Sequence, residues 1–347
     1  MNIELNAARK RNAAQARTGI AACCVAGLLM TGTTPTIAEP ASVTPDQMIS
    51  AMEATFGVTP GERRNHIKGT CAAGEFTATT EAATYSRSPL FSGRGIPVVA
   101  RFSLAGGNPN VPDTARSPRG MALEFRLPEG ALQHMTMLNT PVFGAAIPQT
   151  MLDFIVAIRP DPATGKPDPG KIKAFNESHP DSAAQTQYLA RNNPPPSYAD
   201  SAYFGIHTFR FVDAQGKVTL VRWRFLPQDG EKQLSDDELK TAPKNFLEDA
   251  LIKRTQQGPV RWDMWISIGE PGDAVTDPTL AWPQERKSVK LGTLTLTSAA
   301  PQKGAACEKI NFDPLVLSDG IEATDDPILK FRSPAYAISF GKRLQGK

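Results

Sequence analysis

A tyrosine lies between two arginines near the C-terminal end of the chain, in the stretch FRSPAYAISFGKRL (331–344). If this stretch is helical, Tyr336 and Arg343 are turned by about 40° and about 20° from Arg332 around the helix axis. All three side chains then project from one face, with a guanidinium one turn from the phenol. Such a neighbour favours the phenolate anion over the neutral phenol. A core tyrosine flanked by surface arginines would show the same spacing.

His66 is the second residue that could carry chemistry. It follows Arg63 by three residues in GERRNHIKGTCAAGEFTAT, and the small-residue stretch GTCAAG after it predicts a loop. A histidine in such a loop is more often structural or on the surface than catalytic. We expect structural roles for His134 and His207 and a loop position for His179. Neither the histidines nor the cysteines cluster as metal-binding pairs, and no phosphate-binding, dinucleotide-binding or nucleophile-elbow motif occurs.

Short β-branched and aromatic segments, separated by Gly, Pro, Asp and Asn, occupy much of the chain after residue 60. Five of them predict strands: PVVARFSLA, GMALEFRL, FIVAI, HTFRFVDAQGKVTLVRWRFLP and RWDMWISIG. The fourth reads as a hairpin around the turn DAQGK. Several such strands favour a sheet closed into a barrel, which removes exposed edges.

Helical patterns frame these strands. Residues 44–57 predict an amphipathic helix with Thr44 as its N-cap, and residues 183–195 and 234–258 also read as helical. A Pro- and Gly-rich run from 266 to 330 precedes the final helix. We find no internal repeat and no linker long enough to separate domains. The pattern therefore predicts one α+β domain, residues 39–347, built around an antiparallel β-barrel.

The first 38 residues read as an export signal. A basic segment, AARKRNAAQAR, precedes the apolar run TGIAACCVAGLLMTG and small residues at Thr36 and Ala38. The apolar run is short for a membrane-spanning helix. We therefore expect a cleaved, exported, periplasmic protein with no membrane contact afterwards; an uncleaved anchor or a lipoprotein modified at Cys24 are the alternatives. Residues 1–38 carry four basic residues and one acid, which accounts for the formal charge of +3, so the mature chain is near neutral and gives no reason to expect a nucleic-acid partner.

Four cysteines occur, and Cys23 and Cys24 fall within the predicted signal. Export to an oxidising compartment would permit a disulfide between the remaining two, Cys71 and Cys307. Their wide separation in sequence does not decide between a disulfide and two buried thiols.

Five segments resemble haem catalases and follow one another in family order over about residues 45–347. The segments are RRNHIKGTCAAGEFTAT, VVARFSLAGGNPNVPDTARSPRGMALEFRLPEG, HTFRFVDAQGKVTLVRWRFLP, DPTLAWPQERKSVKLGTLTLT and SDGIEATDDPILKFRSPAYAISFGKRL. The resemblance implies a catalase-like antiparallel barrel of about eight strands with surrounding helices. It also implies that the final helix carries the haem ligand.

The resemblance assigns roles to the residues singled out above. It implies a b-type haem with Tyr336 as the axial iron ligand, kept anionic by Arg332. Arg343, like Arg63 and Arg101, could reach a haem propionate, because guanidinium groups match paired carboxylate oxygens.

On the other side of the haem, His66 matches the distal histidine. It would take a proton from hydrogen peroxide and return it to the departing oxygen, which requires a neutral imidazole at the start. Ser103 matches the serine that orients this ring.

Three departures from catalases matter. In MTMLNTPVFGAAIP, Leu138 occupies the place of the distal asparagine if the Thr-Pro register is kept, and Asn139 matches the second, structural asparagine. A shift by one residue would instead make Asn139 the distal amide. Few of the aromatic residues that usually follow are present: the stretch VFGAAIPQTM leaves only Phe143 and, as a large apolar residue, Met151. This predicts a more open pocket. The chain ends soon after Arg343, so a monomer or dimer is favoured over the catalase tetramer.

These features resemble the small exported catalase-related peroxidases. They imply a haem-dependent peroxidase that reduces hydrogen peroxide or organic peroxides with an organic electron donor and has weak or no catalase activity. A true catalase using Asn139 is one alternative. A periplasmic haem-binding protein without activity is another, although His66, Arg63 and Ser103 argue against it. A relative that converts lipid hydroperoxides is a further alternative.

Overall fold

The computed structural model describes residues 42–347, so the predicted export signal lies outside the described residues. Within this range, ten strands form one antiparallel sheet. The strands are β1 (Gly69–Ala78), β2 (Gly95–Leu104), β3 (Arg119–Arg126), β4 (Leu132–Leu138), β5 (Tyr203–Phe204), β6 (Phe209–Val212), β7 (Val218–Pro227), β8 (Val260–Ile268), β9 (Ser288–Pro301) and β10 (Ile321–Ala323).

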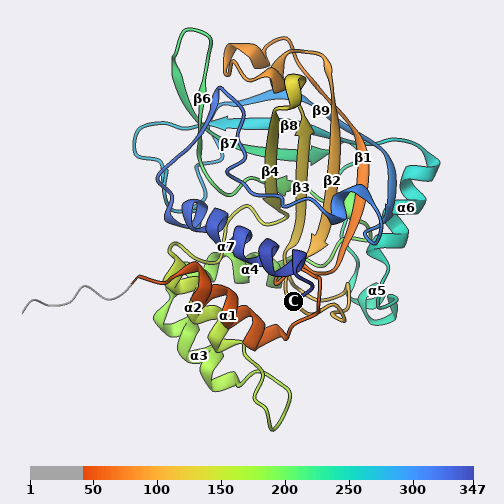
Figure 1. Cartoon of the computed structure of the whole chain (residues 1–347), viewed down its shortest axis with the longest axis vertical. Helices are drawn as coiled ribbons and strands as arrows, with labels where there is room; N and C mark the ends of the chain where they lie inside the picture. Colours follow the sequence, from red (N-terminus) through yellow and green to blue (C-terminus); the bar gives the residue numbers. More distant parts are fainter. Residues whose placement is uncertain (1–41) are drawn as a thin grey trace, which may run out of the picture. The chain divides into compact units, whose positions relative to one another are not determined.

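Eight of the strands close into a barrel, seen in the upper part of Figure 1. Their order around the ring is β7–β5–β4–β3–β2–β1–β9–β8, and β8 pairs back with β7. Strands β6 and β10 extend the sheet beyond β7. The predicted α+β fold with a barrel of about eight strands is therefore confirmed.

The two-residue period of a strand separates the barrel core from the candidate site. On β2, Val98, Ala100 and Phe102 belong to the main hydrophobic core. Arg101 and Ser103 alternate with these residues along the strand, so their side chains must project to the opposite face of the sheet. Both are buried, so this outer face is covered rather than open to solvent.

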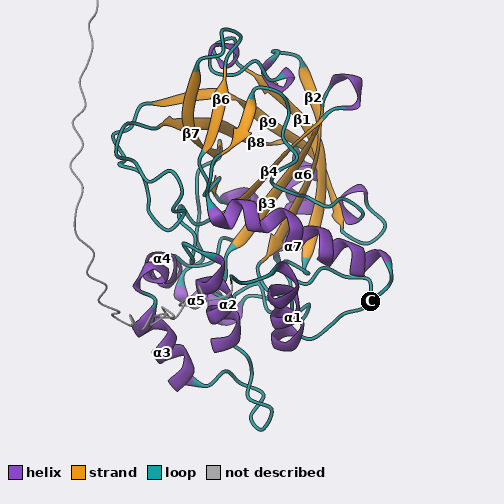
Figure 2. Ribbon diagram, turned by 60° about the vertical axis from the view of Figure 1, so that its left-hand side comes forward, coloured by secondary structure: helices purple, strands orange, loops and turns teal. Residues whose placement is uncertain are grey.

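Seven helices surround the barrel in residues 42–347. They are α1 (Pro45–Phe56), α2 (Pro148–Ala157), α3 (Pro169–Ser178), α4 (Ala183–Arg191), α5 (Asp236–Thr241), α6 (Leu247–Gln257) and α7 (Pro327–Leu344). Helix α7 lies between the barrel and helices α1 and α2 (Figures 1 and 2). None of the helices in this part of the chain has the length and apolarity needed to cross a bilayer.

Helix α7 is held by a hydrophobic cluster on one of its faces. Phe331, Ala335 and Ile338 of α7 pack against Met52 of α1 and Ile155 of α2. On a helix this apolar stripe lies about 100° from the stripe that carries Arg332 and Tyr336. Packing on α1 and α2 therefore fixes the rotation of α7 and points the polar stripe in a different direction.

Several local predictions are confirmed. Thr44 caps α1 through a capping box with Gln47. The predicted hairpin is the pair β6–β7, whose turn lies at 213–217. The predicted final helix is α7, which begins at Pro327, with Asp326 as its N-cap.

Two assignments from short segments were wrong. FIVAI (154–158) was predicted to be a strand, but residues 154–157 end helix α2, which begins with Pro148 at its first turn. A short apolar run does not distinguish a strand from a buried helix face. GTCAAG (69–74) was predicted to be a loop, but it is the first part of β1. Its small residues fit a central strand whose neighbours approach closely; a side chain at Gly74 would overlap the backbone of Thr295.

Two longer predictions also need correction. The stretch 234–258 is not one helix but two, α5 and α6, because Pro243 interrupts it. The run 266–330, described as Pro- and Gly-rich, contains β9, a strand of 14 residues. This strand pairs with both β1 and β8 and so completes the ring.

Cys71 and Cys307, whose pairing the sequence left open, form a disulfide with Cα atoms 5.5 Å apart. Cys71 lies on β1, and Cys307 lies in the segment that follows β9. Both residues are buried beside Val99 and Phe312. The bond therefore fastens that segment to the outer face of the barrel.

Candidate active site

A cavity of about 680 Å³ lies between the outer face of strands β2–β4 and helices α1, α2, α4 and α7. Its volume is in the range of pockets that bury a cofactor or a small ligand. All seven residues predicted for the site line it: Arg63, His66, Arg101, Ser103, Arg332, Tyr336 and Arg343. The structure therefore brings together residues that the sequence places at both ends of the domain.

Tyr336 is positioned from α7 by Arg332, as the helical spacing predicts. Nη2 of Arg332 donates to the phenol oxygen of Tyr336 over 2.8 Å and to the hydroxyl of Thr136 over 2.9 Å. Thr136 lies on β4, so the guanidinium joins the helix to the barrel wall. The charged guanidinium thus fixes the position of the phenol oxygen through a charge-assisted hydrogen bond.

Behind Arg332, His207 and Asp326 form a buried chain of hydrogen bonds. Nη1 of Arg332 donates to Nε2 of His207 over 3.1 Å. A guanidinium can only donate, so Nε2 is an acceptor, and Nδ1–H of His207 donates to Asp326 over 2.6 Å. Burial lowers the pKa of His207, although the Asp326 carboxylate acts against this shift. A neutral imidazole therefore orients Arg332, and this contact gives a specific reason for the structural role predicted for His207.

His66 is held from two sides. Its Nδ1 lies 2.9 Å from the hydroxyl of Ser103 on β2, as the resemblance implies. Its backbone has a φ of 53°, a left-handed conformation that is uncommon outside glycine. The Asn65 side-chain oxygen stabilises this turn by accepting from the backbone N–H groups of His66 and Gly106. A strained backbone conformation that its neighbours hold in place is typical of functional sites.

The surroundings of His66 keep its imidazole neutral. Burial lowers the pKa of His66 to about 3, and the nearby cations Arg101, Arg332 and Arg63 add to the shift. A neutral ring can accept a proton at neutral pH. This is the protonation state that a general base requires.

This shift predicts how stability depends on pH. An unfolded histidine has a pKa near 6.5, well above the value of about 3 in the folded protein. Between these values the unfolded chain binds one more proton, so the free energy of unfolding falls as the pH falls below about 6.5. At pH 5 the loss from His66 should be about 2 kcal/mol. Denaturant unfolding of the wild type and His66→Gln at pH 7 and pH 5 measures it, because the other histidines are common to both proteins. Equal losses in the two proteins would contradict the shift.

Gly120 gives the imidazole and Ser103 the room they need. It pairs with Ser103 across β2 and β3. A Cβ atom at residue 120 would lie 2.9 Å from the Ser103 oxygen and 3.2 Å from the His66 ring. Nothing in the local sequence points to Gly120, because its importance depends on the register between the strands.

Gly120→Ala should therefore disturb the contact between His66 and Ser103. We expect at least about a tenfold lower rate of the peroxide reduction that the resemblance to catalases implies, because a hydrogen bond that positions an acid–base group depends on placement within fractions of an ångström. Gly341→Ala on α7 is the matched control, since nothing lies within 4 Å of a Cβ there. The rate per bound haem should fall in the first variant only; equal rates in both would exclude this role for Gly120.

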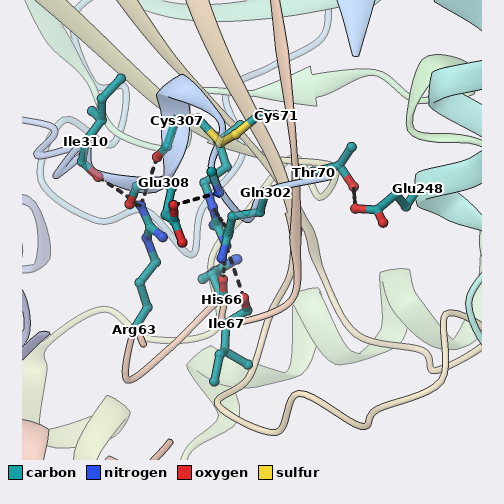
Figure 3. The surroundings of a disulfide bond; sticks show 12 residues. Arg63, His66, Ile67, Thr70, Cys71, Glu248, Gln302, Cys307, Glu308 and Ile310 are labelled. Carbon is teal, nitrogen blue, oxygen red and sulfur yellow. Dashed lines mark hydrogen bonds between the residues drawn. A yellow bond between two sulfur atoms is a disulfide. The ribbon is translucent and has the colours of Figure 1, made fainter. Parts of the chain in front are cut away.

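Arg63, Arg101 and Arg343 form a cluster of positive charge on the same cavity. One nitrogen of Arg63, Nη2, donates to the carbonyl oxygens of Cys307, Glu308 and Ile310 (Figure 3). Its Nη1 is buried and has no hydrogen-bond partner within residues 42–347. Burial, followed by the charges of Arg101 and Arg343, lowers the pKa of Arg63. Glu62 offsets part of this charge, but none of the three arginines makes an ion pair within residues 42–347, so the cluster can pair with a carboxylate.

Arg101 also supports the distal side. Its Nη2 donates to the carbonyl oxygen of His66 over 2.6 Å, and its Nε donates to the side chain of Gln302. A side chain at Gly69 would overlap this guanidinium, so the glycine makes room for it. Arg101 therefore connects the charged cluster to the backbone of His66.

The register around Leu138 and Asn139 agrees with the Thr-Pro alignment. Leu138 pairs with Gly120 and lines the cavity. The side-chain oxygen of Asn139 accepts from the backbone N–H of Arg119 over 2.7 Å, and the two residues also share a backbone hydrogen bond. Asn139 thus ties the end of β4 to the start of β3, while the apolar side chain of Leu138 lines the cavity.

The comparisons with known proteins agree with this geometry. The sequence matches the family model for catalase over residues 54–347. The chain belongs to the catalase family. It is 64% identical over 304 residues to a catalase-related peroxidase of Synechococcus elongatus, covering 88% of this chain and 90% of that protein. It is 36% identical over 298 residues to a catalase-related peroxidase of Mycolicibacterium paratuberculosis, covering 86% and 94%.

Solved catalases share the fold. A bacterial catalase superposes with a TM-score of 0.76 at 28% identity over 82% of this chain, and catalase A from Saccharomyces cerevisiae superposes with a TM-score of 0.76 at 25% identity. This chain covers 58% and 62% of those two proteins. Membership of the catalase family makes the protein a haem peroxidase, an oxidoreductase that acts on hydrogen peroxide.

The residues around the cavity fit a haem. The unpartnered Nη1 of Arg63 and the neighbouring guanidiniums suit its carboxylates. The phenol oxygen of Tyr336 is an oxygen donor of the kind that binds iron in haem proteins. Apolar walls from α1, α2 and α7, including Met52, Met151 and Phe331, suit the porphyrin ring.

Proposed function

We propose that this protein is a haem b peroxidase that reduces hydrogen peroxide with electrons from an organic donor and releases little oxygen. The proposal depends on one observation above the others. Leu138 lines the cavity while Asn139 is engaged with Arg119, and we therefore assign Leu138 to the place of the distal asparagine of catalases. Without that amide, the oxidation of a second peroxide molecule loses a hydrogen-bond donor.

The haem, when bound, supplies the redox chemistry of its iron. Tyr336 would hold the iron through its phenol oxygen, which Arg332 orients by a hydrogen bond. His66 moves the proton: the Ser103 hydroxyl fixes Nδ1, so Nε2 takes a proton from one peroxide oxygen and returns it to the other, which leaves as water. The neutral ring described above permits the first transfer.

The walls near Leu138 support an organic donor. Phe143, Gly144 and Met151 line the cavity beside it, and a side chain at Gly144 would meet Gln185 on α4. Exposed residues of α2 and α4, Phe154 and Thr186, also line the cavity, so it reaches the surface there. This opening gives a carbon-based reductant, such as a phenol, a route toward the haem.

The dependence of peroxide consumption on the donor tests this function. In the haem-loaded protein, consumption should be slow with peroxide alone and should rise and saturate as a phenolic donor is added. One peroxide should oxidise two donor molecules, because each donor gives one electron. Fast consumption that is independent of the donor would favour a true catalase, and no consumption would leave a haem-binding protein.

We further propose that residues 1–38 direct export to the periplasm and are then removed. N-terminal sequencing of the protein isolated from a periplasmic fraction should begin at Glu39, and substitution of the basic residues of AARKR should keep the protein in the cytoplasm. A cytoplasmic protein that retains Met1 would contradict the proposal.

A further inference from the structure

The segment 302–318, here called the strap, leaves the end of β9 and crosses the outer face of the barrel toward β10. The disulfide between Cys307 and Cys71 anchors its first half (Figure 3). Its second half is held by hydrogen bonds from the backbone of His134 to Val316 and from Ser318 to Gln133. The part of the strap around residues 305–311 has the disulfide as its covalent anchor, beside apolar packing and hydrogen bonds from Arg343.

This same part of the strap supplies all three acceptors for Nη2 of Arg63. The distances to the carbonyl oxygens of Cys307, Glu308 and Ile310 are 3.2, 3.1 and 2.9 Å. With Nη2 occupied in this way, the planar guanidinium is fixed and its buried Nη1 points elsewhere without a protein partner. The position of the strap therefore sets the direction in which Arg63 presents its remaining donor.

The disulfide also lies beside Arg101, the second arginine of the cluster. Cys71 on β1 pairs with Arg101 on β2, and side chains paired across strands share one face of the sheet. Nε of Arg101 donates to Gln302, the first residue of the strap. Both ends of this half of the strap are thus tied to the arginine cluster.

We propose that the Cys71–Cys307 disulfide is a positioning device for the cofactor: by fixing the strap carbonyls, it aims Arg63 at a haem carboxylate. Firm retention of haem then requires the oxidised protein. The inference rests on the family's haem and on the role proposed for Arg63, but it does not require peroxidase activity. Haem binding, rather than turnover, is therefore the test.

The variant to make is Cys71→Ala with Cys307→Ala. It removes the covalent anchor and keeps all three backbone carbonyls in the chain. Transfer of haem from the holoprotein to excess apomyoglobin should become roughly tenfold to a hundredfold faster, the cost expected for one charge-assisted hydrogen bond. The absorbance of the transferred haem gives the rate.

A porphyrin without free carboxylates separates positioning from simple loosening. The wild type should release haem dimethyl ester much faster than haem, because the ester cannot pair with Arg63. In the cysteine variant the ratio of the ester rate to the haem rate should fall, because Arg63 is no longer aimed at a carboxylate. If the variant releases both faster but keeps the ratio of the two rates, the disulfide only stabilises the fold and the proposal is wrong.

Thr70→Val is the matched control. Thr70 precedes Cys71 on β1, and its hydroxyl lies 3.1 Å from Glu248 of α6, away from the strap (Figure 3). This variant loses a tertiary contact of the same strand and should keep the ratio of the ester rate to the haem rate. If the ratio of the ester rate to the haem rate falls in Thr70→Val as it does in the cysteine variant, the proposal is contradicted.

Arg63→Gln keeps the test independent of how well the cysteine variant folds. It retains the disulfide and should itself lose the selectivity for haem over the ester. Adding the cysteine substitutions to Arg63→Gln should then cause little further loss of selectivity. If Arg63→Gln keeps the wild-type ratio of the ester rate to the haem rate, the proposal is wrong, whatever the activity of the enzyme.

Discussion

Replacing His66 with alanine should lower the rate of peroxide reduction by roughly a hundredfold to ten-thousandfold, the usual contribution of a positioned general acid–base group. The half-buried, neutral imidazole held by Ser103 is the group that we propose moves the proton between the two peroxide oxygens. Haem should stay bound, because the proposed ligand Tyr336 and the arginine cluster are unchanged. Stopped-flow measurement of the reaction with peroxide, per bound haem, gives the rate.

His179→Ala provides the control for this substitution. His179 ends helix α3, stacks on Phe175 and has no direct contact with His66 or Tyr336. Its loss should leave the rate within about twofold of the wild type, as expected for a half-buried residue that does not line the cavity. Retention of the wild-type rate by His66→Ala would remove His66 from the mechanism.

Leu138→Asn should have the opposite effect and raise oxygen release by about tenfold to a hundredfold, the scale of one well-placed hydrogen-bond donor in a catalytic site. The side chains are similar in size, and Leu138 already lines the cavity at the end of β4. An amide there could hold the second peroxide that a catalase oxidises. An oxygen electrode measures the release, and donor oxidation is followed in the same sample.

Leu138→Ala is the steric control for this variant. It enlarges the cavity without adding a hydrogen-bond donor, so oxygen release should stay low. If alanine raises oxygen release as much as asparagine does, access rather than hydrogen bonding limits the reaction. If neither variant raises it, residue 138 does not separate peroxidase from catalase behaviour.

The sequence was most informative where function depends on local spacing. Arg332 and Tyr336 are neighbours because they are one helical turn apart, and the structure shows the contact. The distal pair was different: His66 and Ser103 are 37 residues apart, and only the resemblance to catalases connected them. The pairing between β1 and β2 brings Ser103 back beside the start of β1.

Contacts over long separations were not visible in the sequence. His207 and Asp326 are 119 residues apart, and no sequence motif links the two residues. The one available signal was Asp326 directly before Pro327, which marks a helix start but not its link to a histidine. Gly120 was equally hidden, since its value comes from the register that places it against Ser103 and His66.

Strands made of small residues were the other difficulty. GTCAAG lacks the β-branched and aromatic residues that usually indicate a strand, yet it forms part of β1. Close approach of neighbouring strands requires glycine and alanine there, and that requirement is tertiary. The disulfide between Cys71 and Cys307 could not be predicted either, because the two residues are 236 positions apart and only the tertiary structure brings them together.

The most direct test of the central claim is the amount of oxygen released per peroxide consumed by the wild-type holoprotein in the presence of a phenolic donor. A catalase releases one oxygen molecule for every two peroxides, whereas a peroxidase converts peroxide to water and oxidises the donor. We predict little oxygen and two oxidised donor molecules per peroxide, as Leu138 at the distal position implies. Oxygen near the full catalase yield, with little oxidised donor, would contradict the account.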